Sequence, residues 1–282
     1  MRQRVMVARQ SNLATTPTMT PTILVFDSGL GGLTVYREVT KARPDARCVY
    51  AADDAFFPYG RQRESELTER VLTVVGELIE AHRPDLVVVA CNTASTLVLP
   101  QLRAHFKAPF VGTVPAIKPA CAASKSRLVS VLGTEATVQR EYTRALIRDF
   151  AGGCDIHLVG SPRLAEIAEA MLHGGTVIDT DIAAELTPCF VEKDGKRTDT
   201  IALACTHYPL LLDTLNRLAP WPVAFIDPAP AIARRVVDLL GPSTGAPTTA
   251  TRFVFTSGRV PSTALKATLA SLGIAEIAVA SV

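Results

Sequence analysis

The chain has 282 residues, enough for two ordinary domains or one large α/β domain, and 48% of them are apolar. Basic and acidic side chains nearly balance, 29 against 27, so the net charge of +2 predicts neither a nucleic-acid partner nor an anionic membrane surface as partner. The sequence holds no apolar run close to the roughly 20 residues that cross a bilayer, which excludes a transmembrane helix.

The first 21 residues differ in composition from everything that follows. They contain Arg2, Arg4 and Arg9, no acidic residue, and a stretch rich in Thr and Pro. An organelle transit peptide has this composition, but so does a disordered extension or a coding start placed upstream of Met19. We favour the last two and expect residues 1–21 to be a disordered extension outside the fold.

From residue 22 onward, apolar strands alternate with amphipathic helices. The continuous apolar run 23–26 is typical of a parallel strand buried on both faces, and a Gly-rich turn follows it at 27–32. Pro100 is compatible with a helix only in the first turn. The other predicted elements of this half are strands at 47–52 and 86–90 and helices at 33–41, 64–81 and 96–106.

The second half follows the same alternation, which predicts an α/β fold with mainly parallel sheets. The predicted strands are 127–132, 155–159, 201–204 and 224–227. The predicted helices are 138–150, 162–172, 180–190, 210–218 and 229–240. A loop at 241–251 precedes a last strand, helix and strand over 252–282.

Two segments about 110 residues apart resemble each other. Residues 85–93 (DLVVVACNT) align without gaps on residues 199–207 (DTIALACTH), so each segment has an acidic residue six positions before a cysteine. Each predicted strand therefore delivers a thiol, Cys91 or Cys205, to its carboxyl end, where open α/β sheets bind ligands. This internal pseudo-repeat predicts two structurally similar halves, with one thiol contributed by each.

Six cysteines occur in total, at positions 48, 91, 121, 154, 189 and 205, and none forms a C-x-x-C pair. Their spacing predicts no metal site, and a chain of this length does not need disulfides. We therefore expect reduced thiols in a cytoplasmic protein, most of them buried as small apolar side chains.

Two thiols on opposite sides of one cleft suit the inversion of a stereocentre, because one can remove a proton while the other delivers one. The ordinary pKa of a thiol, about 8.5, can be tuned toward neutrality. Each cysteine precedes a predicted helix, whose amino-terminal dipole favours thiolate. His207 and Asp27 are the side chains placed to share a proton with Cys205 and Cys91, respectively.

Several neighbours of the cysteines can hold the carboxylates of a ligand through hydrogen bonds, namely Ser28, Asn92, Thr93 and Thr206. Ordinary turn and N-cap duty is the alternative for each of them. The turn at 27–32 lacks the pattern of a phosphate loop. No lysine stands in a context that favours a pyridoxal phosphate Schiff base.

Five motifs occur in the order and spacing of the glutamate racemases: DSGLGG at 27–32, PYG at 58–60, CNTA at 91–94, GTEAT at 133–137 and CTHYP at 205–209. The chain resembles this family from about residue 23 to residue 226, and more weakly beyond. The resemblance implies two pseudo-symmetric α/β domains with the active site in the cleft between them. We place the first domain at 22–113 plus 226–282 and the second at 114–225.

The resemblance also implies a function: cofactor-independent interconversion of L- and D-glutamate, which supplies D-glutamate for peptidoglycan, in an enzyme that is often a homodimer. Cys91 would deprotonate D-glutamate and Cys205 L-glutamate, with Asp27 and His207 as auxiliary groups. The residues implied to contact substrate are Asp27, Ser28, Tyr59, Gly60, Asn92, Thr93, Thr206 and His207.

Members of the family usually carry a further acidic residue that assists the second cysteine. Counting from Pro162 places Glu169 there, with Glu166 as a nearby competitor. The assignment departs from the family pattern at 160–164 (GSPRL), where Ser161 stands in place of the usual cysteine.

Three other interpretations stay open at this point. An aspartate racemase typically has glutamate where this chain has His207. A thiol hydrolase or amidase would use one cysteine as nucleophile and leave the other idle. A non-catalytic relative would bind glutamate or a protein partner without exchanging the α-proton.

Overall fold

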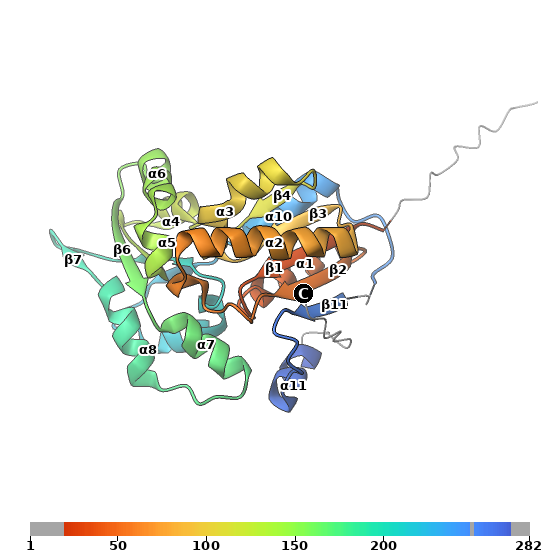
Figure 1. Ribbon diagram of the computed structural model, residues 1–282. Helices are drawn as coiled ribbons and strands as arrows, with labels where there is room; N and C mark the ends of the chain where they lie inside the picture. The colour runs from red at the N-terminus through yellow and green to blue at the C-terminus, as the bar shows by residue number, and fades with distance from the viewer. Residues whose placement is uncertain (1–19, 249–250, 272–282) are drawn as a thin grey trace, which may run out of the picture.

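The computed structural model describes residues 20–248 and 251–271, and in them two parallel sheets lie side by side with helices on their faces (Figure 1). The first sheet has the strand order β11-β2-β1-β3-β4 and the second the order β10-β9-β5-β6. The α/β class predicted from the sequence is therefore confirmed. Residues 1–19 of the predicted extension and the last predicted strand lie outside the described residues.

The strands of the first sheet are β1 (Thr22–Asp27), β2 (Arg47–Ala52), β3 (Leu86–Val89), β4 (Phe110–Gly112) and β11 (Thr251–Phe255). Those of the second are β5 (Leu128–Thr134), β6 (Asp155–Ser161), β9 (Thr200–Ala204) and β10 (Ala224–Ile226). A short antiparallel hairpin pairs β7 (Glu192–Lys193) with β8 (Lys196–Arg197).

The helices associated with the first sheet are α1 (Leu33–Ala42), α2 (Glu64–His82), α3 (Asn92–His105), α10 (Ala229–Leu240) and α11 (Thr263–Ser271). Those of the second are α4 (Ile117–Ala123), α5 (Glu135–Gln139), α6 (Glu141–Phe150), α7 (Leu164–Leu172), α8 (Asp179–Leu186) and α9 (Leu212–Leu218). The 3₁₀ turns are η1 (Tyr59–Arg61), η2 (Thr187–Cys189) and η3 (Tyr208–Leu211).

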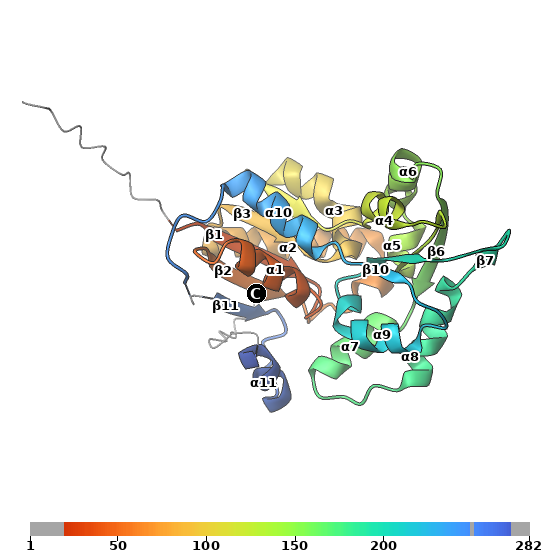
Figure 2. The same cartoon turned by 180° about the vertical axis from the view of Figure 1, so that it is seen from behind.

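Each parallel sheet is covered on both faces, because alternate side chains of a strand point to opposite sides. In β1, Ile23 and Val25 pack under α1 and α10, while Leu24 and Phe26 pack under α2 and α3. The second sheet is divided in the same way between α7, α8 and α9 on one face and α4 and α6 on the other. Figure 2 shows α1 and α10 together on one side of the first sheet.

The two sheets share one topology once the edge strand β11 is set aside. The order β2-β1-β3-β4 in the first corresponds to β6-β5-β9-β10 in the second, with all neighbours parallel. In this correspondence β3, which precedes Cys91, matches β9, which precedes Cys205. The internal repeat expected from the sequence is thus present in the strand order, and the exact domain boundaries stay a prediction.

Two predicted helices differ from the structure. The helix α3 begins at Asn92, directly after Cys91, and not at the predicted position 96, so Pro100 lies inside it rather than in its first turn. Proline there removes one helical hydrogen bond to the carbonyl of Thr96, and Thr96 itself bonds back to the backbone through its hydroxyl group. The single helix predicted at 138–150 is broken at Arg140, whose ψ of 142° is extended.

The structure also contains β4, α4 and the β7–β8 hairpin, for which the sequence analysis predicted no element. No helix among the described residues is long and apolar enough to span a membrane.

Candidate active site

The polar groups singled out in the sequence gather where β1, β3 and β9 end. Asp27 closes β1, Cys91 follows β3, and Cys205 follows β9. Both thiols are buried, with exposed fractions of 5% and 7%. They lie close enough for a negative charge on Cys205 to raise the pKa of Cys91. The strand ends of the two sheets therefore bring the paired thiols to one shared site.

Asp27 connects the two halves. Its Oδ2 accepts hydrogen bonds from the amides of Gly32 at 3.0 Å and Gly29 at 3.2 Å, and its Oδ1 accepts one from the hydroxyl of Thr206 at 3.3 Å. Burial raises the pKa of this carboxyl above its usual range, while the nearby charge of His207 opposes the rise. Asp27 thus lies between the Gly-rich turn after β1 and the segment after β9.

Cys91 precedes a helix, as the sequence predicted, and is the N-cap residue of α3, but its thiol is not tuned toward neutrality. Burial and, secondly, the charge of Asp27 raise the pKa of Cys91 to about 12. Hydrogen bonds from the amide of Ala94 and the hydroxyl of Ser28 offset only part of this rise. The expected effect of the helix dipole is therefore outweighed by desolvation, and Cys91 is a protonated thiol.

The Cys205 side is built differently. The 3₁₀ turn η3 begins at Tyr208 and α9 only at Leu212, so no α-helix starts directly after Cys205. The group next to this thiol is instead an imidazole. The Nδ1 of His207 is hydrogen bonded to the Cys205 sulfur at 3.8 Å, and its Nε2 to Oε2 of Glu169 at 2.7 Å. Burial lowers the pKa of His207, but the bonds to Cys205 and Glu169 outweigh burial and hold it well above its usual range.

The Gly-rich turn leaves just enough room for this imidazole. A Cβ atom added at Gly31 would lie 2.3 Å from Nδ1 of His207, far inside van der Waals contact. The His207 ring is held by Cys205 and Glu169, so it cannot move away without breaking these bonds. The close approach explains why glycine is required at this position of the DSGLGG motif.

Glu169 and Glu166 occupy different places, although both lie on α7. Glu169 accepts the amide proton of Leu30 at 3.0 Å on the same oxygen that contacts His207. Glu166 instead forms an ion pair with Arg61 at 2.7 Å, and its side chain is 35% exposed. Of the two acids proposed from the sequence, only Glu169 reaches the Cys205 side of the site.

The residues after Cys91 form a polar wall. Both amide atoms of Asn92 are buried and, within the described part of the chain, have no hydrogen-bond partner. The hydroxyl of Thr93 lies 3.0 Å from that of Thr134 and 3.3 Å from that of Thr137. An unpartnered buried amide is costly, so Asn92 is positioned as a donor and acceptor for a ligand.

Tyr59 and Gly60 lie beside this wall with different parts facing it. The hydroxyl of Tyr59 donates to Asp53 at 2.7 Å and its ring packs in the core, so the side chain does not face the site. Gly60 lies against Thr134, whose Cβ would be 3.3 Å from a Cβ at this glycine. A substrate contact by Tyr59 would therefore involve its backbone rather than its hydroxyl.

Some groups that shape the site were not singled out from the sequence. Thr134 caps α5 by accepting the amide proton of Thr137, a pattern that its Thr-x-x-Thr spacing could have indicated. The amide of Leu30 and the carboxylate of Asp53 carry no sequence signal, because they become important only through contacts made in the folded chain. Among the described residues, no three His, Cys, Asp or Glu side chains converge on a metal-binding position.

The arrangement can transfer protons from two directions. Each half supplies one thiol, each thiol has its own polar neighbours, and an unpartnered amide lies beside them. The fold is that of an α/β protein with two similar parallel sheets, and its site contains one buried thiol from each half. The chain belongs to the Asp/Glu/Hydantoin racemase family, whose model matches residues 24–236.

Individual relatives agree with this assignment. The glutamate racemase of Brucella canis is 57% identical over 227 residues, which cover 79% of this chain and 82% of that protein. The structure is similar to Escherichia coli glutamate racemase in complex with L-glutamate and the activator UDP-MurNAc-Ala, with a TM-score of 0.84, 39% identity and coverage of 93% and 98%. It is also similar to the glutamate racemase isoform RacE1 of Bacillus anthracis, with a TM-score of 0.75, 27% identity and coverage of 93% and 97%.

Proposed function

We propose that this chain interconverts L- and D-glutamate by proton transfer between two cysteines and so supplies D-glutamate for peptidoglycan. The observation that carries the proposal is the pair of buried thiols at matched strand ends, in a chain 57% identical to a glutamate racemase. The two thiols supply both the acid and the base, so the proposed reaction needs no cofactor.

In the proposed mechanism, the Cys205 thiolate removes the α-proton of L-glutamate, and the Cys91 thiol then delivers a proton to the opposite face of the carbanion. The reverse reaction begins with a Cys91 thiolate and a Cys205 thiol. The His207 imidazolium lies next to the Cys205 sulfur and stabilises negative charge there. The protonated Cys91 then matches the form of the enzyme that accepts L-glutamate first.

The substrate carboxylates are assigned to the polar wall and the Gly-rich turn. Asn92 offers its unpartnered amide, and Ser28, Thr93 and Thr206 offer hydroxyl groups. The backbone amides of the turn and of the start of α3 add donors that favour anions. Asp27 is assigned to the same region and keeps Thr206 in place through its hydrogen bond.

The direct test is circular dichroism of L-glutamate and D-glutamate, and separately of both aspartate enantiomers, incubated with purified protein without pyridoxal phosphate. We expect the signal of either glutamate enantiomer to decay to zero and that of aspartate to persist. Decay with aspartate alone would replace the substrate assignment. Binding of glutamate without exchange of its α-proton in deuterated water would identify a non-catalytic protein.

A homodimer located in the cytoplasm is the expected context of this enzyme. Reduced thiols favour the cytoplasmic location, because all six cysteines are free in the structure and both proposed catalytic thiols need to stay reduced. Light scattering coupled to size exclusion would test the dimer, which predicts twice the 30.1 kDa mass of the chain.

A further inference from the structure

A second histidine, His173, reaches the outer oxygen of Glu169. Its Nε2 lies 3.9 Å from Oε1 of Glu169, whereas Oε2 of the same carboxylate is bound to His207 and to the amide of Leu30. The two histidines differ in exposure: the His207 side chain is 2% exposed and that of His173 is 47% exposed. Glu169 therefore lies between a buried imidazole and one in contact with solvent.

The end of α7 is built so that His173 keeps this position. His173 is the C-cap residue, and its amide bonds to the carbonyls of Glu169 and Ala170. Gly174 follows with a positive φ of 86°, a conformation that ends a helix and that glycine adopts without strain. The backbone thus turns away directly after His173 and leaves its ring beside the carboxylate one turn earlier.

His173 and Glu169 are spaced i,i+4 at the end of the same helix, so their side chains lie on one face, one turn apart. Of the remaining charged side chains around this ring, Asp54 is already bonded to Ser257, and Arg259 comes from the loop after β11.

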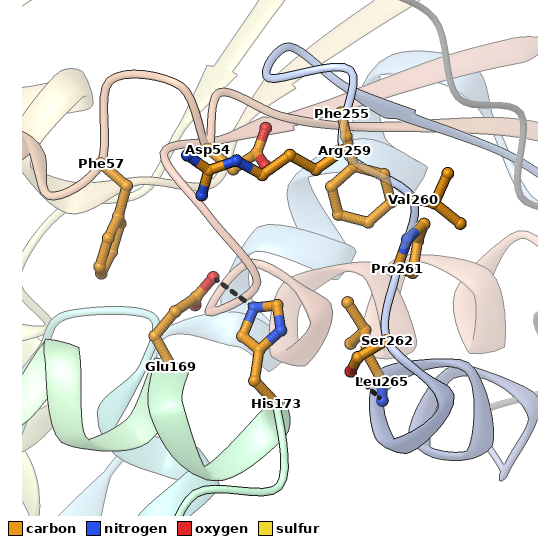
Figure 3. A pocket seen from close by; sticks show the side chains of 10 residues that line it. All are labelled: Asp54, Phe57, Glu169, His173, Phe255, Arg259, Val260, Pro261, Ser262 and Leu265. Carbon is orange, nitrogen blue, oxygen red and sulfur yellow. Dashed lines mark hydrogen bonds and ion pairs between the residues drawn. The ribbon is translucent and has the colours of Figure 1, made fainter.

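His173 also borders a cavity of about 320 Å³ that the segment after β11 closes from the other side. Figure 3 shows Glu169 and His173 from α7 facing Arg259, Pro261 and Leu265 across this space. A cavity of this size has room for water. The pseudo-symmetric Cys91 side has Thr93 in the place of His207 and a cluster of hydroxyls behind it.

We propose that His173 is a positioning residue for the Cys205 half of the reaction: by holding the outer oxygen of Glu169, it keeps the inner oxygen on His207. The inference rests on the proposed racemisation, since it concerns one of the two proton transfers. Without the His173 contact, Glu169 is held only through Oε2, by His207 and the Leu30 amide, and its carboxylate turns more easily toward the cavity. The bond to His207 is then made less of the time, and proton abstraction by Cys205 becomes slower.

The readout is the primary isotope effect on kcat/KM, measured with α-deuterated L-glutamate and with α-deuterated D-glutamate. Cys205 removes the deuteron from the L enantiomer and Cys91 removes it from the D enantiomer. Because the enantiomers have equal free energy, kcat/KM itself falls equally in both directions and cannot report the side. The two isotope effects can, since each reports how far its own proton transfer limits the rate.

The variants are chosen to separate the contact from the fold. His173→Asn keeps a polar residue at the helix end but is too short to reach Glu169, whereas His173→Gln places an amide nitrogen where Nε2 was. His157→Asn, on the exposed face of β6, is the matched control. We expect His173→Asn to lower kcat/KM about two- to tenfold, to raise the L isotope effect and to lower the D isotope effect. His173→Gln should bring both isotope effects part of the way back to those of the unaltered protein. The control His157→Asn should leave kcat/KM and both isotope effects unchanged.

Two failures are distinguishable. If the unaltered protein does not racemise glutamate, the proposed function is wrong and no isotope effect exists to measure. If it racemises glutamate but His173→Asn leaves both isotope effects unchanged, or lowers kcat/KM without separating them, His173 has no role in the Cys205 step. A melting temperature close to that of the unaltered protein confirms that the variant is folded.

Discussion

The two halves of the molecule place a cysteine at the same point of the same topology and then surround it differently. Two residues after Cys91 stands Thr93, whose hydroxyl belongs to a neutral cluster with Thr134 and Thr137. Two residues after Cys205 stands His207, which connects the thiol to a carboxylate. The repeat therefore fixes where the thiols lie, and the residues that break the repeat decide where the proton is held.

This asymmetry has a chemical reason. In a two-thiol racemisation, one sulfur must be negative while the other is protonated, and two identical surroundings would leave that choice open. Burial and Asp27 keep Cys91 protonated by raising its pKa to about 12. On the other side, the high pKa of His207 keeps an imidazolium next to Cys205. In the proposed mechanism, this asymmetry favours the form of the enzyme that accepts L-glutamate first.

The largest effect is expected from removing either thiol. Cys91→Ser and Cys205→Ser, made separately, replace a tunable thiol by a hydroxyl that stays protonated. Each variant should lose about 10²- to 10⁴-fold in racemisation, which is the usual contribution of a general acid or base. Circular dichroism of both glutamate enantiomers measures this loss. A hydrolase or amidase would instead be inactivated by only one of the two replacements.

The next effect separates the two acids of α7. Glu169→Gln removes the charge from a hydrogen bond to His207, and such a bond contributes about 1.5–3 kcal/mol, or roughly ten- to a hundredfold in rate. Glu166→Gln breaks only an exposed ion pair with Arg61 and should change the rate less than about twofold. Steady-state kinetics of both variants test this. Equal losses in the two would mean that α7 acts as a scaffold rather than through Glu169.

Sequence reasoning predicted the strands better than the site around them. Continuous apolar runs such as 23–26 favour buried strands, and β1 and β2 match their predicted ranges within one residue. Amphipathic spacing predicted α10 equally well. The matched position of Cys91 and Cys205 followed from the same patterns, because a strand end is set by the strand. The effect of proline and the starts of helices were harder to predict from the sequence. Tertiary packing keeps Pro100 inside α3 against its local preference.

The electrostatics could not be predicted from local sequence. That Cys91 precedes a helix suggested a lowered pKa, but the dominant influence is burial among residues distant in the chain. Glu169 reaches His207 across 38 positions and Leu30 across 139. Such contacts depend on how the halves pack, and only the family spacing distinguished Glu169 from Glu166 as the better candidate.

A third prediction concerns the pH dependence of stability. The folded protein raises the pKa of His207 above its usual 6.5, so the folded state binds this proton more tightly than the unfolded chain. The resulting stability is fully present below pH 6.5 and is lost as the pH rises through the higher folded pKa, by at most about 1.4 kcal/mol per pH unit. Urea unfolding between pH 6 and about 7.5 measures it.

His207→Asn is the comparison for this measurement, because it removes the titrating group and keeps a polar side chain. As the pH rises across this range, the free energy of unfolding should fall more steeply for the unaltered protein than for the variant. The upper limit stays about one pH unit below the ordinary pKa of the thiols in the unfolded chain, about 8.5. Parallel curves for the two proteins would show that folding brings the His207–Cys205 pair no net proton, either because His207 is neutral or because its proton comes from the Cys205 thiol.

The smallest effect is expected in the neutral cluster on the Cys91 side. Thr137→Val keeps the shape of a fully buried side chain but removes the hydroxyl shared with Thr93 and Thr134. The loss of one neutral hydrogen bond should lower the free energy of unfolding by about 1 kcal/mol. Thr137→Ser, which keeps the hydroxyl, is the matched control for that measurement.

The kinetic consequence of Thr137→Val should be the mirror image of the change expected for His173→Asn. Loosening Thr93 affects the transfer made by Cys91, so the isotope effect with deuterated D-glutamate should rise and that with L-glutamate should fall. If both variants shifted the isotope effects in the same direction, the two sides would not act as separate proton-transfer units. Opposite shifts, by contrast, would assign each thiol its own enantiomer without altering either cysteine.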